Sequence, residues 1–85
     1  MLKLPAIFSD HMILQRNRVV YVWGESDATK VTVSIQDVKI PVDVIDGKWM
    51  AALSPIEGGG PYEMEITSDL DDRIVFEDVV YGEVW

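Results

Sequence analysis

The chain has 85 residues, of which 48% are hydrophobic, and its 15 acidic and 7 basic residues give a formal net charge of −8 at pH 7. This length allows one small domain, and the charge argues against nucleic acid or an anionic membrane as partner, because both are bound through clustered lysine and arginine. The absence of cysteine excludes disulfides and thiolate metal sites. No apolar stretch has the roughly 20 residues of a membrane span, and residues 1–5 lack the features of a signal peptide.

Apolar and polar residues alternate along most of the chain, as they do in strands with one buried face. The first stretch, residues 4–16, is less regular and ends in a short strand over residues 12–15. Residues 19–23 are apolar on both faces and predict a central strand or one that is covered on both sides. Further strands are predicted around five sets of inward-facing residues: Val31, Val33 and Ile35; Ile40, Val42 and Val44; Trp49, Ala51 and Leu53; Tyr62, Met64 and Ile66; Ile74 and Phe76.

Turn signals separate these strands at short intervals. Residues 36–37 (Gln-Asp) and 46–47 (Asp-Gly) fit tight hairpin turns, residues 58–61 (Gly-Gly-Gly-Pro) predict a break, and residues 69–72 predict a polar loop. Pro41 cannot donate a hydrogen bond to a neighbouring strand, so its strand is expected at a sheet edge or at a bulge. The pattern predicts an all-β fold, a small antiparallel immunoglobulin-like β-sandwich of six or seven strands.

His11 is the only histidine, so any histidine-dependent triad or metal site within the chain must use it. Ser9 and Asp10 are its neighbours, but neighbouring side chains on an extended segment point apart and do not form a triad. We expect Ser9 and Asp10 to organise a turn through side-chain hydrogen bonds to the backbone, and His11 to be half-buried. No catalytic, cofactor-binding or metal-binding residue is therefore assigned within the chain.

Two acidic groups have structural interpretations. Asp69, Asp71 and Asp72 resemble part of a calcium loop but lack its glycine and its bidentate glutamate, so a solvated loop of mutually repelling carboxylates is expected. Glu63 and Glu65 alternate on one strand. Paired carboxylates serve acid–base chemistry when they flank a cleft, but the expected role here is an exposed strand face that discourages edge pairing.

Trp23, Trp49, Tyr62 and Trp85 are candidates for carbohydrate binding, because sugars stack on exposed aromatic faces. Trp49 and Tyr62 occupy inward positions of their strands and are predicted to be core residues. Trp23 lies at a strand end, where either a core or a surface position is open to it. A patch near the end of the chain is predicted to be exposed unless another domain covers it: it consists of Val79, Val80, Tyr81, Val84 and Trp85.

Five blocks, in chain order, are distinctive: residues 4–16 (LPAIFSDHMILQR), 22–24 (VWG), 46–49 (DGKW), 59–62 (GGPY) and 78–85 (DVVYGEVW). Together they resemble the sialate O-acetylesterase family. The resemblance implies that residues 1–85 are a single N-terminal β-sandwich domain and that an SGNH-type hydrolase domain, carrying the Ser-His-Asp triad, follows Trp85. Glu83 and Trp85 would lie near that active site without acting in it. The apolar run at the end of the chain agrees with a fragment of a longer polypeptide.

The reaction implied by this resemblance is hydrolysis of acetyl esters on sugar hydroxyls, on sialic acid or on plant polysaccharides, without metal or organic cofactor. It also implies an extracellular, periplasmic or lysosomal location. The 85-residue chain itself would be an inactive accessory domain whose partners are its own hydrolase domain and an O-acetylated glycan. The alternative is a stand-alone carbohydrate-binding or adhesion module that uses exposed aromatic residues such as Trp23.

Overall fold

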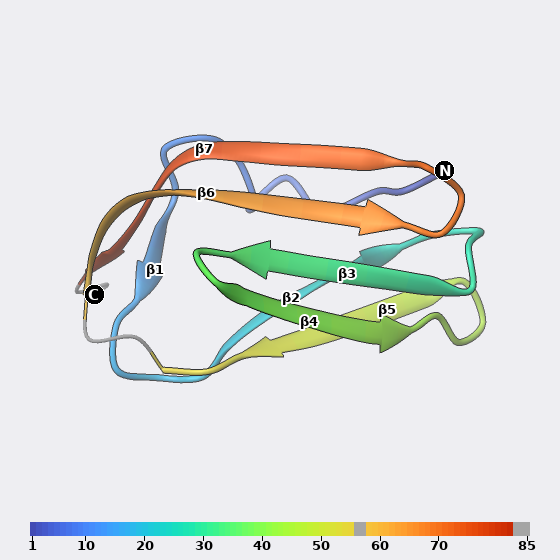
Figure 1. Cartoon of the computed structure of the whole chain (residues 1–85), viewed down its shortest axis with the longest axis horizontal. Coiled ribbons are helices and arrows are strands. Elements are labelled where there is room, and N and C mark those ends of the chain that lie inside the picture. The colour runs from blue at the N-terminus through green and yellow to red at the C-terminus, as the bar shows by residue number, and fades with distance from the viewer. Residues whose placement is uncertain (56–57, 83–85) are drawn as a thin grey trace.

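The computed structural model describes residues 1–55 and 58–82. In this part of the chain there are seven strands and no helix (Figure 1). Their bounds are β1 Ile13–Gln15, β2 Val20–Glu25, β3 Lys30–Ile35, β4 Val38–Asp43, β5 Lys48–Leu53, β6 Gly59–Ser68 and β7 Arg73–Gly82. Accordingly, none of the described residues belongs to a helix long and apolar enough to cross a membrane.

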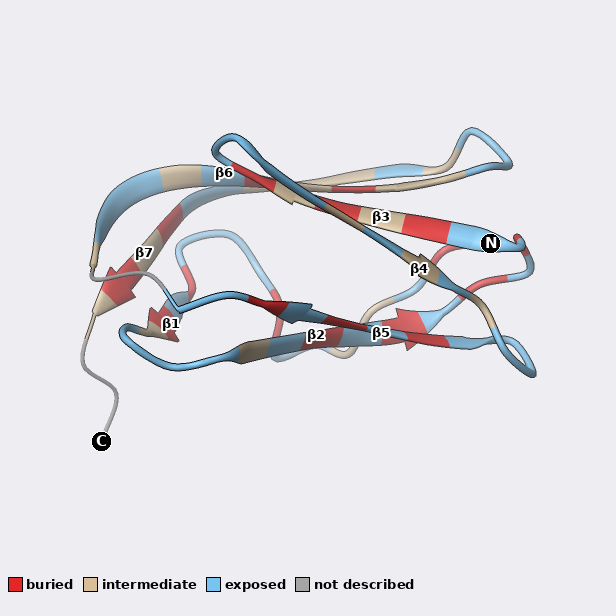
Figure 2. Ribbon diagram, turned by 60° about the horizontal axis from the view of Figure 1, so that its bottom comes forward, coloured by how far each residue is buried: buried red, intermediate tan, exposed pale blue. Residues whose placement is uncertain are grey.

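The strands form two sheets that face each other (Figure 2). One sheet has five strands in the order β1-β7-β6-β3-β4, and the other consists of β2 and β5. The predicted all-β sandwich of six or seven strands is confirmed. The pairs are antiparallel except for β1 and β7, which run parallel, with Ile13 beside Val80 and Leu14 beside Tyr81.

The core lies between the sheets because alternate residues of each strand point inward. Val31, Val33 and Ile35 of β3 are at most 1% exposed, and Met64 and Ile66 of β6 are fully buried. Figure 2 shows this alternation of buried and exposed residues along the strands of both sheets. Other predicted inward residues are half-buried and pack against the core: Ile40, Val42, Val44, Tyr62, Ile74 and Phe76.

Two predicted hairpin turns are confirmed. Ile45 and Lys48 exchange backbone hydrogen bonds of 2.8 and 3.0 Å around Asp46 and Gly47. Both turn residues have positive φ, 52° and 78°, as a type I′ turn requires, and glycine adopts this conformation without a steric penalty. The turn at residues 36–37 joins β3 directly to β4. Pro41 lies in β4, an edge strand, as its missing N–H predicts.

The glycine-rich segment does not break the structure as predicted. Strand β6 begins at Gly59, within the segment, and its pairing with β7 shifts register between Gly59 and Tyr62 and again between Tyr62 and Met64. Gly58, Gly59 and Gly60 all have positive φ. The segment therefore continues as an irregular strand, because glycine tolerates the left-handed conformations that a bulged ladder imposes.

The N-terminal segment connects the two sheets. Lys3 exchanges two backbone hydrogen bonds of 2.9 Å with Glu25 of β2, and the N–H of Val80 in β7 donates to the carbonyl of Met12. The close approach of Lys3 requires a glycine at position 24, because a Cβ there would lie 2.1 Å from the carbonyl oxygen of Lys3. Residues 3–15 thus cross from the edge of the small sheet to the edge of the large one (Figure 1).

Candidate functional site

The outer face of β2 is exposed, so the prediction that residues 19–23 form a strand covered on both sides is wrong. Val22 is fully buried, whereas Tyr21 and Trp23 point to the opposite side and are 53% and 40% exposed. The physical reason is the small size of the β2–β5 sheet, which has the core on one face and no described strand on the other. Apolar side chains are therefore left at the surface.

The exposed residues of β2 and β5 lie side by side and line one groove. The strand register places Trp23 opposite Met50 and Tyr21 opposite Ala52. Tyr21, Trp23 and Met50, together with Ile45 and the segment of residues 3–5, surround an open volume of about 1040 Å³. We call this surface, which is lined centrally by Tyr21, Trp23, Ile45 and Met50, the aromatic groove.

The indole of Trp23 is held in place from one side. The ring of Phe8 contacts it edge to face, with a centroid separation of 5.0 Å and an interplanar angle of 82°, a geometry that aromatic pairs favour. Phe8 is itself 8% exposed and belongs to the core. The orientation of the Trp23 ring in the aromatic groove is therefore fixed by its contact with the core.

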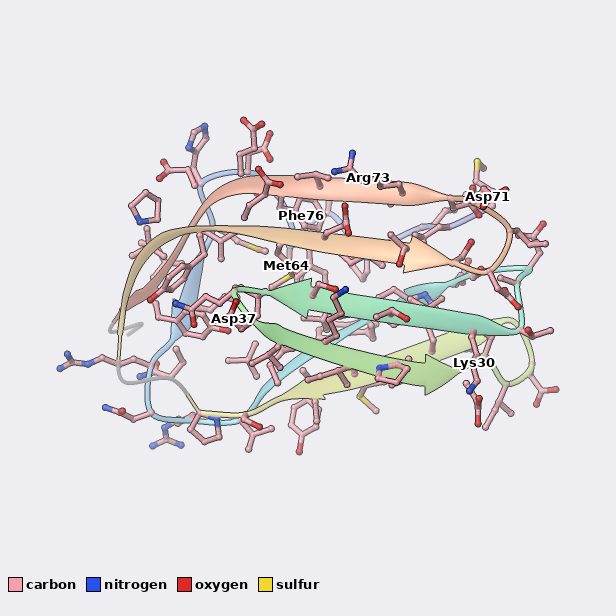
Figure 3. All side chains as sticks on the ribbon, viewed as in Figure 1. Lys30, Asp37, Met64, Asp71, Arg73 and Phe76 are labelled. Carbon is pink, nitrogen blue, oxygen red and sulfur yellow. The ribbon has the colours of Figure 1, made fainter. Side chains whose placement is uncertain are left out.

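Charged residues lie at one end of the aromatic groove. Glu25 of β2 is opposite Lys48 of β5, and Lys3 and Asp43 line the same end. Asp43 also lies 3.9 Å from the ammonium nitrogen of Lys30, which is labelled in Figure 3. The two lysines and two carboxylates that line the groove balance each other, although the whole chain carries a net charge of −8.

His11 lies on the surface, away from the residues that line the aromatic groove, and its predicted half-buried position is wrong. Its side chain is 74% exposed, and its Nδ1 lies 2.7 Å from Oδ2 of Asp78. This hydrogen bond raises the pKa of the imidazole, with smaller contributions from the charges of Asp78, Asp10 and Glu77. Asp10 does bind backbone, as expected, but its Oδ1 accepts from the N–H of Glu77 in β7 at 2.8 Å.

The acidic loop is more ordered than the predicted group of repelling carboxylates. Asp69 accepts hydrogen bonds from the backbone N–H groups of Thr29 and Lys30, at 3.0 and 3.3 Å, and from the Thr29 hydroxyl. These bonds, led by the hydroxyl, lower the pKa of Asp69. Asp72 pairs with Ser68, while Asp71 is exposed. Within residues 1–55 and 58–82 no cluster of metal-ligating side chains occurs.

The two glutamates of β6 lie on its outer side, as predicted. Glu63 is exposed, and Glu65 is half-buried and pairs with the guanidinium of Arg73 on β7. Figure 3 shows Arg73 on the uppermost strand of that view, on β7. Glu65 therefore joins neighbouring strands of the large sheet.

The predicted exposed patch near the chain end is wrong where it can be compared. Val79 and Tyr81 are 0% and 3% exposed, because the bulge in β7 between Phe76 and Val79 turns them toward the core. Burial raises the pKa of the Tyr81 hydroxyl, and its oxygen has no hydrogen-bond partner among the described residues. Glu83, Val84 and Trp85, the other residues assigned to this region, lie outside the described residues.

Of the aromatic candidates, Trp49 is confirmed as a core residue at 3% exposure, and Tyr62 is half-buried against the core. Trp23 is exposed, and Trp85 lies outside the described residues. Sequence reasoning missed Tyr21, Ile45 and Met50 as the neighbours of Trp23 in the aromatic groove. One feature of the sequence indicates this surface: Met50 is an apolar residue at an outward-facing position of β5, between the inward-facing Trp49 and Ala51.

No protein-family model matches the chain, and no curated protein matches it. Among solved structures, the chain is similar to a carbohydrate acetylesterase from Xanthomonas citri, with 30% sequence identity and a TM-score of 0.93. The similarity covers 100% of this chain and 20% of that protein. The chain thus spans about one fifth of the length of this solved structure, and the two are related at the level of the fold.

Proposed function

We propose that this chain is a non-catalytic β-sandwich domain of a carbohydrate O-acetylesterase. The observation that supports the proposal is the similarity of the whole chain, at a TM-score of 0.93, to one fifth of a carbohydrate acetylesterase. In this proposal residues 1–85 are one domain, and a hydrolase domain follows Trp85. The hydrolase domain supplies the serine, histidine and aspartate, and acyl transfer then proceeds through nucleophilic attack and an oxyanion hole.

The finer assignment is to the sialate O-acetylesterase family, on the five sequence blocks that resemble it. In the structure, several residues of these blocks maintain the fold, whereas Trp23 of the second block lines the aromatic groove. Gly24 admits the backbone of Lys3, Asp46 and Gly47 form a type I′ turn, and Trp49 fills the core. Residues that maintain a scaffold are what a non-catalytic domain needs to share with its relatives.

The role proposed for the domain is to pack against the hydrolase domain and to contribute to the entrance of its cleft. Strand β7 leads toward that domain, and its end is held against β1 through the pairing of Gln15 with Gly82. This pairing fixes the direction in which the chain leaves β7 toward the proposed hydrolase domain. A rigid domain at the edge of a cleft can orient a glycan without taking part in the chemistry.

The test is to compare the 85-residue chain with the polypeptide encoded by the natural reading frame continued past Trp85. We expect the frame to continue into a segment with a nucleophilic serine, and the longer protein to hydrolyse an aryl acetate and acetylated sugars. The 85-residue chain should not exceed a heat-treated control. Turnover by the 85-residue chain, or a stop codon directly after Trp85, would contradict the proposal.

A second candidate function is a stand-alone carbohydrate-binding or adhesion module, and the aromatic groove favours it. The exposed rings of Tyr21 and Trp23 lie at alternate positions of one strand, with charged groups at the end of the groove. This candidate predicts glycan binding by a chain whose reading frame ends at Trp85. The reading frame therefore separates the two functions.

A further inference from the structure

We propose that the aromatic groove binds a neutral, O-acetylated oligosaccharide, with sugar rings on Tyr21 and Trp23 and acetyl methyl groups against Met50 and Ile45. The inference rests on the proposed function for the carbohydrate class of the ligand. It goes further by assigning the binding site, the residues that form it and the charge of the ligand.

The spacing of the two aromatic side chains suits a chain of sugars. Tyr21 and Trp23 lie two residues apart on the same face of β2, which separates their Cα atoms by roughly 6.5 to 7 Å. Two aromatic rings at this separation can contact different rings of one oligosaccharide. The C–H faces of sugar rings pack on aromatic rings, and the remaining polar edges stay in contact with water.

The groove is prepared for a ligand before binding. Phe8 contacts the Trp23 ring edge to face at 5.0 Å, and Trp23 is paired across the sheet with Met50. A side chain that is already ordered loses little conformational entropy when a ligand binds. The apolar surface of Met50 and Ile45, 59% and 70% exposed, is available for methyl groups that an unmodified sugar does not carry.

The charges indicate a neutral ligand. Lys3 and Lys48 balance Glu25 and Asp43 along the groove, while the rest of the chain is strongly acidic and repels anions. The same four side chains provide donors and acceptors for sugar hydroxyls at one end of the groove. An anionic sugar would meet no excess of positive charge here.

The charged end of the aromatic groove lies far from the end of β7. Strand β4 ends and β5 begins at one end of the longest axis, whereas β7 ends at the other (Figure 1). The domain extends 33 Å along this axis. A connection from β7 to the proposed hydrolase domain therefore starts at the end of the domain opposite to Lys48 and Asp43.

The experiment is an NMR titration of the ¹⁵N-labelled 85-residue chain with acetylated xylo-oligosaccharides and with the same oligosaccharides after alkaline deacetylation. We expect shifts of the Trp23 indole N–H and of the amides of residues 21–25 and 48–52, with a Kd of roughly 1 mM. Deacetylation should weaken binding. Tyr21→Ala and Met50→Ala should each weaken it by roughly tenfold, and Leu70→Ala, equally exposed in the β6–β7 turn, should not change it.

Several results would overturn the inference. These are the absence of shifts at roughly 10 mM acetylated oligosaccharide, shifts located outside the groove, equal binding of the deacetylated ligand, and tighter binding of an acetylated sialoside. Self-association through Tyr21 and Trp23 without ligand would also overturn it. Failure of the proposed function is seen separately in the reading frame and the esterase assay, since neither measurement depends on the groove.

Discussion

The imidazole of His11 and the carboxylate of Asp78 lie 2.7 Å apart, and both residues have left-handed backbone conformations, with φ of 65° and 56°. Around them, the N–H of His11 donates to the carbonyl of Glu77, and Asp10 accepts from the N–H of Glu77. The ion pair therefore joins the loop before β1 to the bulge in β7, two segments that lie far apart in the sequence.

Stability should depend on pH through this pair. The folded pKa of His11 is raised above 6.5, so its contribution is complete below pH 6.5 and is lost as the pH rises through the folded pKa. We expect the free energy of unfolding of the wild type, minus that of His11→Gln, to fall over this window. Urea titrations at a series of pH values measure it. Asp78→Asn should remove the same pH dependence, and a difference that grows with pH would contradict the prediction.

Asp69→Ala should lower the melting temperature at pH 7, because the carboxylate holds Thr29 and Lys30 next to the β6–β7 turn. Its folded pKa lies below 3.8, so this stabilisation is present above pH 3.8 and is lost as the pH falls through the folded value. The difference between variant and wild type should therefore shrink in acid. Asp37→Ala, in the exposed β3–β4 turn (Figure 3), is the matched control. Equal melting temperatures of both variants at pH 7 would refute the role of Asp69.

Gly24→Ala should destabilise the domain by about 1–3 kcal/mol. The added Cβ would lie 2.1 Å from the Lys3 carbonyl oxygen, so the two hydrogen bonds between Lys3 and Glu25 could not persist. Gly82→Ala is the control, because a Cβ there would meet Ile13 at an ordinary 3.7 Å. Chemical denaturation of both variants measures the effect, and a Gly24→Ala protein as stable as wild type would show that residues 3–5 do not hold the β2 edge.

Truncating a side chain in the core should lower the free energy of unfolding far more than truncating one in the aromatic groove. Ile66 is fully buried in β6, so Ile66→Ala should cost about 2–5 kcal/mol of unfolding free energy. Ile45 is 70% exposed, and Ile45→Ala should stay within about 0.5 kcal/mol of wild type. Urea midpoints with unchanged slopes are the appropriate measurement. A large loss at Ile45 would mean that the groove is closed in solution.

Local patterns predicted the sandwich well. The alternation of apolar and polar residues indicates which face of a strand is buried, and the dipeptide Asp46-Gly47 indicates a hairpin turn at these residues. The same patterns were insufficient for β2. An apolar outer row, such as that of Tyr21 and Trp23, looks the same in a sequence whether a second layer covers it or it faces a groove. Whether the outer row is covered or exposed depends on how many strands each sheet contains.

Hydrogen bonds between residues far apart in the sequence also could not be predicted. Asp69 appeared as one member of a repelling acidic loop, because its partners Thr29 and Lys30 lie about 40 residues earlier in the chain. His11 and Asp78 are separated by 67 residues. Such pairs depend on strand order, and strand order cannot be inferred from periodicity alone.

The parallel pairing of Ile13 with Val80 has a consequence for the order in which the domain is made. At a translation rate of about 5–20 residues per second, Val80 leaves the ribosome roughly 3 to 13 s after Ile13. During that interval β1 has no sheet to join, and the tunnel must release the last strand before the first can pair. The closure of this edge is therefore the last step in forming the sandwich, and a ribosome stalled within β7 holds a sandwich whose first strand is still unpaired.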